Sequence, residues 1–189
     1  ARMGCASGSC MDKEYIYVSG KLPTDVGLYD AFNDRIPVTL YSQALMTTSI
    51  TMFASTLLGT LENPTGPQIM RMRYRTDEEG NYIPDEGYII WDETQQQAMF
   101  KTQMHVYLDA PGLKPKILGI ELETNMHSLP LTIDLYGPVT FMPDGRMEIK
   151  LKNESAVDID VEVGSSSKVD LKIMAGELSI NLVSKMVKR

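Results

Sequence analysis

The sequence has little of what catalytic and nucleic-acid-binding domains depend on. It contains two cysteines, two histidines and one tryptophan in 189 residues, and 25 acidic residues outnumber 18 basic ones. The net charge of −7 excludes broad nucleic-acid binding, because phosphates require a basic surface. Neither a glycine-rich phosphate loop nor a G-x-S-x-G turn occurs. We therefore expect a protein that is not an enzyme and binds no cofactor.

The few cysteines and histidines form no metal-binding pattern. Cys5 and Cys10 cannot make a zinc site alone, and their spacing is not that of a C-x-x-C redox motif. They are candidates for a disulfide with each other or with another chain. His105 and His127 could meet on adjacent strands near Glu121, but the spacing supplies no full ligand set. We interpret them as exposed sheet histidines and expect no metal.

A long apolar helix is also missing. Although no charge occurs between Arg35 and Glu62, Ser, Thr and Gln are frequent there and Pro37 interrupts the stretch. A membrane span needs about 20 predominantly apolar residues, so the chain is not expected to be an integral membrane protein. The stretch predicts buried secondary structure, either a pair of strands or one helix near residues 38–58.

What the sequence does contain is alternation of aliphatic and polar residues. Because successive side chains of a strand point to opposite faces, such alternation predicts strands with one apolar face. The pattern predicts seven strands between residues 98 and 184, beginning with Phe100 to Leu108 and Leu118 to Leu122. The aliphatic positions of the last five strands are Leu131, Ile133, Leu135, Met147, Ile149, Leu151, Val157, Ile159, Val161, Val169, Leu171, Ile173, Leu178, Ile180 and Leu182.

Short turn segments separate these strands, for example Pro143-Asp144-Gly145 and Ala175-Gly176. Short connections place neighbouring strands antiparallel. We therefore predict a mainly β fold with an antiparallel meander over residues 98–189. An irregular cysteine-containing segment, residues 1–25, and a mixed segment, residues 26–97, precede it.

The aliphatic face of this meander has to be covered. Each large apolar side chain contributes about 1.5–3 kcal/mol when it is buried, and residues 36–61 are expected to be too few to cover every strand. Excess apolar surface indicates a binding partner. Lipid, another protein subunit or the rest of the chain could provide the cover.

Charged residues of the amino-terminal half offer weaker candidates. Arg71, Arg73 and Arg75 project from one face of a predicted strand, Ile69 to Arg75, and guanidinium groups match phosphate oxygens. The alternative is a solvent-exposed face that balances the acidic loop from Thr76 to Gly87. That loop lacks the EF-hand pattern, so we interpret it as solvated.

Two short motifs favour an extracellular setting. Asn153-Glu154-Ser155 is an N-glycosylation acceptor between two predicted strands. The chain ends at Lys188-Arg189, a dibasic pair of the kind at which proproteins are cut. Glycosylation at Asn153 and a secreted location are therefore predicted.

Several segments between Phe100 and Ser184 resemble a known family. With Ser128-Leu129-Pro130-Leu131 entering a strand and Gly137-Pro138-Val139-Thr140-Phe141 following it, the region resembles the lipid-cavity sheets of the large lipid transfer proteins, such as vitellogenins, apolipophorins, apolipoprotein B and the microsomal triglyceride transfer protein. It is also similar to the tubular lipid-binding domains of the bactericidal/permeability-increasing type. The resemblance implies an open sheet that lines a lipid pocket, and secreted precursors that are often cleaved at basic sites.

The sequence therefore predicts a non-catalytic lipid-binding or lipid-transport β-sheet domain, as a processed fragment of a larger secreted protein. The fifteen aliphatic positions above are its candidate lipid-facing residues. The alternative is a structural assembly subunit of a virus, phage or extracellular filament. There the apolar face would pack on other subunits, and Cys5 and Cys10 would link chains.

Overall fold

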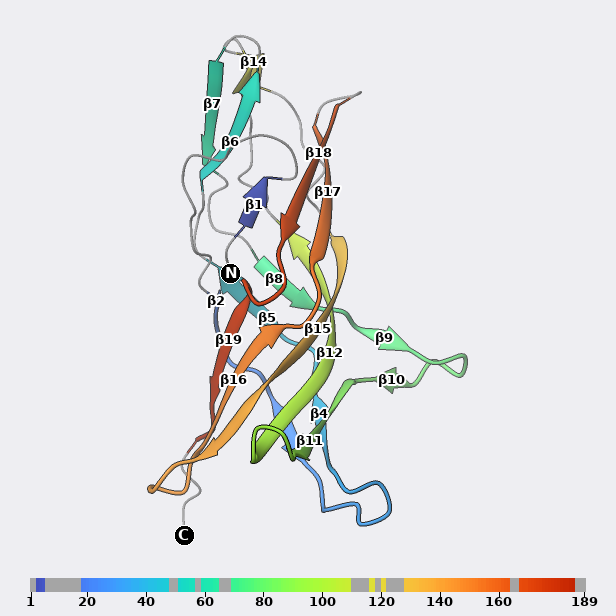
Figure 1. Cartoon of the computed structure of the whole chain (residues 1–189). Helices are drawn as coiled ribbons and strands as arrows, with labels where there is room; N and C mark the ends of the chain where they lie inside the picture. The colour runs from blue at the N-terminus through green and yellow to red at the C-terminus, as the bar shows by residue number, and fades with distance from the viewer. Residues whose placement is uncertain are drawn as a thin grey trace.

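The chain folds into β-strands joined by turns (Figure 1). The structure, a computed structural model, describes residues 3–5, 18–47, 51–56, 59–64, 69–109, 116–117, 120–121, 128–163 and 167–185. All regular secondary structure in these ranges is β, and no helix in them could cross a membrane. The prediction of a mainly β, antiparallel fold is confirmed.

A ten-stranded antiparallel sheet forms the body of the molecule. Its strands are β2 (Val18–Ser19), β3 (Thr24–Val26), β4 (Ile36–Leu40), β5 (Ala44–Thr47), β8 (Ile69–Met72), β11 (Asp85–Asp92), β12 (Gln97–Asp109), β15 (Leu129–Phe141), β16 (Met147–Asn153) and β19 (Ser179–Val183). Seven of them follow the order β19-β16-β15-β12-β11-β4-β3, while β8 pairs with β12, β5 with β8, and β2 with β5. The sheet therefore takes strands from both halves of the chain.

Four small antiparallel sheets accompany it. One joins β1 (Met3–Cys5), β18 (Ser167–Ile173) and β17 (Val157–Val163); the others pair β6 (Thr51–Thr56) with β7 (Gly59–Pro64), β9 (Arg75–Thr76) with β10 (Tyr82–Ile83), and β13 (Lys116–Ile117) with β14 (Ile120–Glu121). The β9–β10 pair projects from the body as an arm (Figure 1). Two tyrosine rings, Tyr74 and Tyr82, stack across the base of this arm with centroids 4.8 Å apart.

Strand β12 organises the curl of the sheet. One of its edges pairs with β15 over residues 99–108. The other edge pairs first with β11, over residues 97–102, and then with β8, over residues 106–109. β11 and β8 therefore share one edge of β12. Two groups of strands diverge from this edge, β11-β4-β3 and β8-β5-β2, and the sheet curls (Figure 1).

Of the two alternatives predicted for residues 38–58, the strands are confirmed and the helix is wrong, because β4, β5 and β6 occupy the described part of this stretch. Pro37 lies within β4, where a missing N–H is tolerated more easily than inside a helix. A non-strand break at residues 41–43 then ends β4. There Ser42 donates its backbone N–H to the Tyr82 hydroxyl at 2.6 Å and its hydroxyl to the Met72 carbonyl at 3.0 Å.

The predicted meander is antiparallel but not continuous. After β16 the chain leaves the main sheet to form the β17–β18 hairpin, and it returns as β19, which pairs with β16. Asn153 closes the base of this excursion. Its Nδ2 donates to the carbonyls of Ser155 and Met174 at 2.7 and 2.9 Å, and its Oδ1 accepts from the Leu178 N–H at 2.8 Å.

This role speaks against the predicted glycosylation of Asn153. The residue is only 2% exposed, and a glycan would have to be attached to the same Nδ2 that makes both carbonyl bonds. A buried amide that loses such partners leaves polar groups unsatisfied, which costs about 1–3 kcal/mol each. In this fold Asn153 serves as a structural bridge.

A tyrosine anchors the β11–β12 turn across the sheet. The Tyr136 hydroxyl on β15 donates to Asp92 Oδ2 at 2.7 Å. This bond, burial and the negative charges of Asp92 and Glu154 raise the pKa of Tyr136 to about 12 from 10.0. Glu154 is itself paired with Lys101 at 3.2 Å, and Lys101 and Lys152 are the strand neighbours of Tyr136.

A raised tyrosine pKa has a defined effect on stability. Its contribution is fully present below pH 10, the ordinary value, and is lost as the pH rises through about 12. We expect Tyr136→Phe to reduce the free energy of unfolding by about 1 kcal/mol at pH 8, and this difference from the wild type to shrink between pH 10 and 12. Urea titrations across this range measure it. A pH-independent difference would contradict the assigned cause.

Candidate functional site

The concave side of the curled sheet is the candidate site. On β12 the side chains of Phe100, Met104, Val106 and Leu108 are buried, while the alternating Lys101 side chain points to solvent. This is the two-residue period that the sequence predicted. The buried cluster also takes side chains from β4, β5, β8, β11, β15, β16 and β19, so it runs across both groups of strands.

Most of the fifteen candidate lipid-facing residues enter this cluster. Ten are buried within the chain: Leu131, Ile133, Leu135, Ile149, Leu151, Val157, Ile159, Ile173, Leu178 and Ile180. Met147 and Leu182 are half-buried and pack against it. The side chains of Val161, Val169 and Leu171 lie outside the described part of the structure.

The chain itself covers more of the apolar face than the sequence predicted. Val38, Leu40 and Leu45, from the uncharged stretch, and Met70 and Met72, from β8, are buried in the same cluster. The ten buried positions are therefore not an uncovered surface. That they contact lipid stays a prediction, and such contact requires a ligand to be housed among them.

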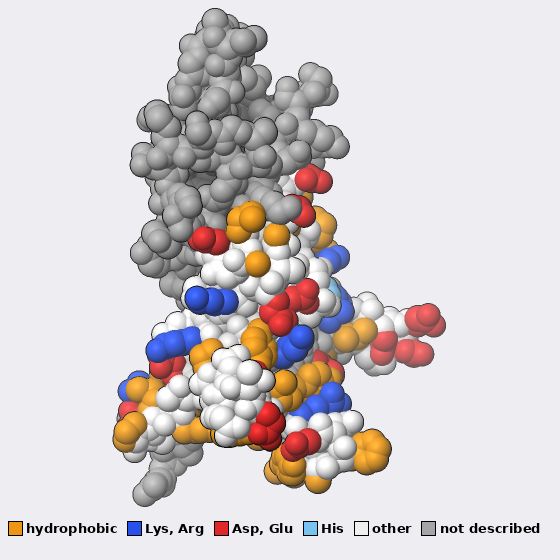
Figure 2. Space-filling view, in the orientation of Figure 1, with side chains coloured by type: hydrophobic (Ala, Val, Ile, Leu, Met, Phe, Trp, Pro, Cys, Tyr) orange, Lys and Arg blue, Asp and Glu red, His pale blue; other side chains and the backbone are white. Residues whose placement is uncertain are grey.

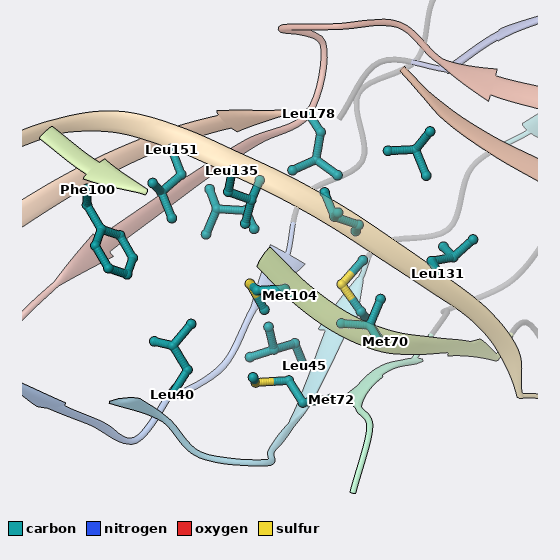
Figure 3. Close-up of a cluster of buried hydrophobic side chains, with 14 of the residues drawn as sticks. Leu40, Leu45, Met70, Met72, Phe100, Met104, Leu131, Leu135, Leu151 and Leu178 are labelled. Carbon is teal, nitrogen blue, oxygen red and sulfur yellow. The ribbon is translucent and has the colours of Figure 1, made fainter. Parts of the chain in front are cut away.

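Three methionines occupy one part of the cluster. Met70, Met72 and Met104 lie close to Leu45 (Figure 3). The pairing of β8 brings them together, because Met70 is the strand partner of both Leu45 on β5 and Leu108 on β12. Methionine is flexible and polarisable, so it adapts to apolar shapes that branched side chains do not fit.

The buried carboxylate of Asp85 bonds to the edge of β12 that faces away from β15. Asp85 is 3% exposed, and its Oδ2 accepts the His105 backbone N–H at 2.9 Å. Its Oδ1 lies 2.8 Å from both His105 Nδ1 and Arg75 Nη2. His105 stands between the part of β12 that pairs with β11 and the part that pairs with β8. The carboxylate therefore replaces a missing strand partner.

The His105–Asp85 pair has the geometry of a base with its orienting acid. Nucleophilic catalysis also needs a hydroxyl or thiol within hydrogen-bond reach of the base. Among the described residues, Asp85 is the only side chain that bonds to the His105 ring. His127, its predicted neighbour, lies outside the described residues, as does Cys10, the predicted partner of Cys5. No group of three or more His, Cys, Asp or Glu suited to a metal occurs in the described ranges.

Two of the three candidate headgroup arginines are already neutralised. Arg71 forms a two-point ion pair with Asp109, Nε to Oδ2 at 2.6 Å and Nη2 to Oδ1 at 3.1 Å, and this hydrogen bond raises the pKa of Arg71. Arg75 pairs with Asp85. The Arg73 guanidinium lies 4.9 Å from the centre of the Tyr107 ring. Arg71 and Arg75 are therefore engaged by carboxylates, while Arg71 and Arg73 both lie against the Tyr107 ring.

Comparisons with known proteins add one named relative. Alkane uptake protein B of Marinobacter nauticus is 37% identical to this chain over an alignment 213 residues long. The match covers the whole of this chain and 20% of that protein, so the chain spans about a fifth of the relative's length. No family profile matches the chain, and no solved structure matches it. The resemblance to lipid transfer proteins gains no support from a family profile.

Proposed function

We propose that this chain is a non-catalytic β-sheet domain that binds long-chain apolar molecules, hydrocarbons or lipids, within its curled sheet. The observation that carries the proposal is the continuous apolar cluster between two diverging groups of strands. The name of the relative, an alkane uptake protein, supports an apolar ligand. A secreted location stays a prediction.

The physical basis is the burial of hydrocarbon. Each methylene group that leaves water contributes about 0.8 kcal/mol, so a long alkyl chain needs no polar contact to bind. The cluster is already packed, and a ligand therefore has to displace side chains as it enters. The methionines Met70, Met72 and Met104 meet this requirement better than branched residues, because unbranched side chains change rotamer at little cost.

The test is retention of n-hexadecane by the purified chain. After incubation with an n-hexadecane emulsion, native mass spectrometry is expected to show the chain with bound hexadecane. Displacement of a fluorescent fatty-acid analogue gives the affinity. A chain that carries no hexadecane and displaces no analogue would overturn the proposal, and lipid-free oligomers that grow with concentration would favour an assembly subunit instead.

A matched pair of variants locates the ligand. Met72→Leu with Met104→Leu keeps the volume of the core and is expected to cost less than about 1.5 kcal/mol of stability. We expect it to weaken analogue binding about fivefold, or about 1 kcal/mol, because leucine is less adaptable. Met174→Leu is the control, since Met174 is 53% exposed, and binding should not change. An equal loss of analogue binding in the double variant and in Met174→Leu would place the ligand outside the cluster.

A further inference from the structure

Several turns meet at one end of the main sheet. Ile36, the first residue of β4, pairs with Ile89 of β11, and Met99 of β12 pairs with Pro138 of β15. In the same way Phe141 pairs with the first residue of β16. Antiparallel pairing therefore brings three turns, residues 27–35, 93–96 and 142–146, to the same end of the strands, at the lower end of Figure 1. We call this end of the sheet the turn end.

The turn end exposes most of the large apolar side chains that are not buried. Of the ten exposed large hydrophobic residues among those described, seven lie there: Val26, Leu28, Tyr29, Phe32, Trp91, Phe141 and Val183. Leu28 and Phe32 are 91% and 95% exposed, so the fold leaves them almost entirely in water. Figure 2 shows hydrophobic side chains gathered along this lower edge.

Three aspartates at these turns accept hydrogen bonds from nearby backbone N–H groups. Asp30 accepts the backbone N–H groups of Phe32 and Asn33 at 3.1 and 3.2 Å. Asp92 accepts those of Thr94 and Gln95 at 2.8 and 3.0 Å.

Asp144 accepts the backbone N–H and Nε of Arg146 at 3.1 and 2.7 Å. The pKa of each carboxyl lies below the usual 3.8. The largest causes are the Asn33 side-chain bond to Asp30, the Tyr136 hydroxyl bond to Asp92 and the Arg146 backbone bond to Asp144, and the other bonds above add to them. Each turn is therefore held in shape by its own acid, while the apolar side chains stay free to make contacts.

We infer that the turn end docks on the surface of a lipid bilayer with uncharged, zwitterionic headgroups. The inference rests on the proposed function, because a domain that takes up apolar molecules has to approach the phase that holds them. Trp91 and Tyr29 have amphipathic rings of the kind that settle at headgroup level. Leu28, Phe32 and Phe141 have no polar group and suit the acyl boundary beneath.

The charge and the shape of the turn end favour a bilayer with zwitterionic headgroups. The three turns carry four carboxylates, Asp30, Asp34, Glu93 and Asp144, and two cations, Arg35 and Arg146. An anionic membrane attracts clusters of basic residues, so this surface favours neutral headgroups. The apolar side chains also stand on separate turns rather than in one flat patch, and a fluid lipid surface accommodates such protrusions without a complementary shape.

The single tryptophan of the chain makes the inference directly testable. Trp91 is 53% exposed in the free chain. On addition of phosphatidylcholine vesicles, its emission is expected to shift to shorter wavelength, and brominated phosphatidylcholine is expected to quench it. Unchanged emission with both kinds of vesicle would overturn the inference.

Variants at the turn tip test the contact surface. Leu28→Ser with Phe32→Ser keeps the backbone bonds to Asp30, and we expect at least a tenfold loss of vesicle partitioning, or about 1.4 kcal/mol. Met174→Ser is the matched control, because Met174 is as exposed as Trp91 but precedes the opposite end of β19. We expect it to change partitioning less than twofold. An equal loss in both variants would contradict docking through the turn end.

The remaining outcomes distinguish other occupants and separate this inference from the proposed function. Binding to an n-hexadecane emulsion but not to vesicles would overturn a bilayer in favour of bare hydrocarbon. A shift of Trp91 emission that depends on protein concentration without lipid would overturn it in favour of a second copy of the chain. The Leu28→Ser, Phe32→Ser variant should still displace the fatty-acid analogue, so loss of vesicle binding alone leaves interior binding intact.

Discussion

Replacing Gly137 with alanine is expected to lower the free energy of unfolding by at least about 3 kcal/mol. A Cβ at this position would overlap the carbonyl oxygen of Lys150 and would lie 2.7 Å from its carbonyl carbon and 3.0 Å from Leu151 Cα. These are backbone atoms, which cannot rotate away. Gly137 is paired with Phe100 on the other side, so β15 has no room to retreat.

The position also explains the shape of the sheet. Pairing of β15 with β16 is interrupted at Gly137 and Pro138 and resumes at Val139 in the same register. Glycine inside a strand marks a close approach of another backbone, and proline cannot donate to the ladder. The two residues therefore let β16 approach and the sheet curl around the apolar cluster.

Urea unfolding measures this effect. Gly80→Ala provides the control, because a Cβ at Gly80 meets nothing within 4 Å and only its positive φ of 86° opposes alanine. We expect a loss of about 1 kcal/mol there. If Gly137→Ala were no more destabilising than Gly80→Ala, the close approach of β15 and β16 would be refuted. Loss of analogue binding in a still-folded Gly137→Ala chain would connect the curl to the ligand.

Replacing Asp85 with alanine is expected to cost roughly 3 kcal/mol of unfolding free energy at pH 7. The substitution removes a buried carboxylate that serves three donors: the His105 N–H, the His105 ring and Arg75. The Arg75 charge would remain without its counter-ion, and the edge of β12 would lose its bridge between β11 and β8. A donor left unsatisfied by itself costs about 1–3 kcal/mol.

The conservative variant and a control define the cause. Asp85→Asn keeps an oxygen for the His105 N–H but removes the charge opposite Arg75, so we expect about half of the loss. Asp25→Ala removes an exposed carboxylate that accepts one hydrogen bond, from the Tyr41 hydroxyl at 2.8 Å, and should cost less than about 1 kcal/mol. Equal stability of Asp85→Ala and Asp25→Ala, measured by urea unfolding, would refute the bridging role.

Alternation alone was enough to predict most strands of the carboxyl-terminal half. The predicted strand from Leu118 to Leu122 is wrong, because the short antiparallel pair β13 and β14 lies there instead. The predicted strands around Met104, Ile133 and Ile149 coincide with β12, β15 and β16, and their aliphatic side chains are buried as expected. This success has a simple physical reason. The two-residue period of a strand is a local property, and a charged residue at every second position cannot be buried without a partner.

The partners of those strands depended on contacts that are distant in sequence. The excursion of β17 and β18 follows from the hydrogen bonds of Asn153 to Met174 and Leu178, residues more than twenty positions away. The division of β12 between β11 and β8 depends on Asp85 reaching His105. In the sequence Asn153 suggested a glycosylation site, and Asp85 was only part of an acidic loop.

The exposed residues of the turn end were missed for a related reason. Leu28 and Phe32 stand in a segment without alternation, and the sequence does not tell whether such residues join the core. A weak signal was present, because apolar residues beside the turn-forming Asp30 and Asn33 have no strand period that would bury them.

By itself the amino-acid sequence determined most of the carboxyl-terminal strands, their antiparallel direction and the side of each strand that is apolar, because these follow from local geometry and solvation. Tertiary structure alone decided that the apolar side is covered by the chain's own residues and which turns share one end. Those features are set by the curl at Gly137 and by the buried hydrogen bonds of Asp85 and Asn153. Each of them joins segments whose proximity no local pattern specifies.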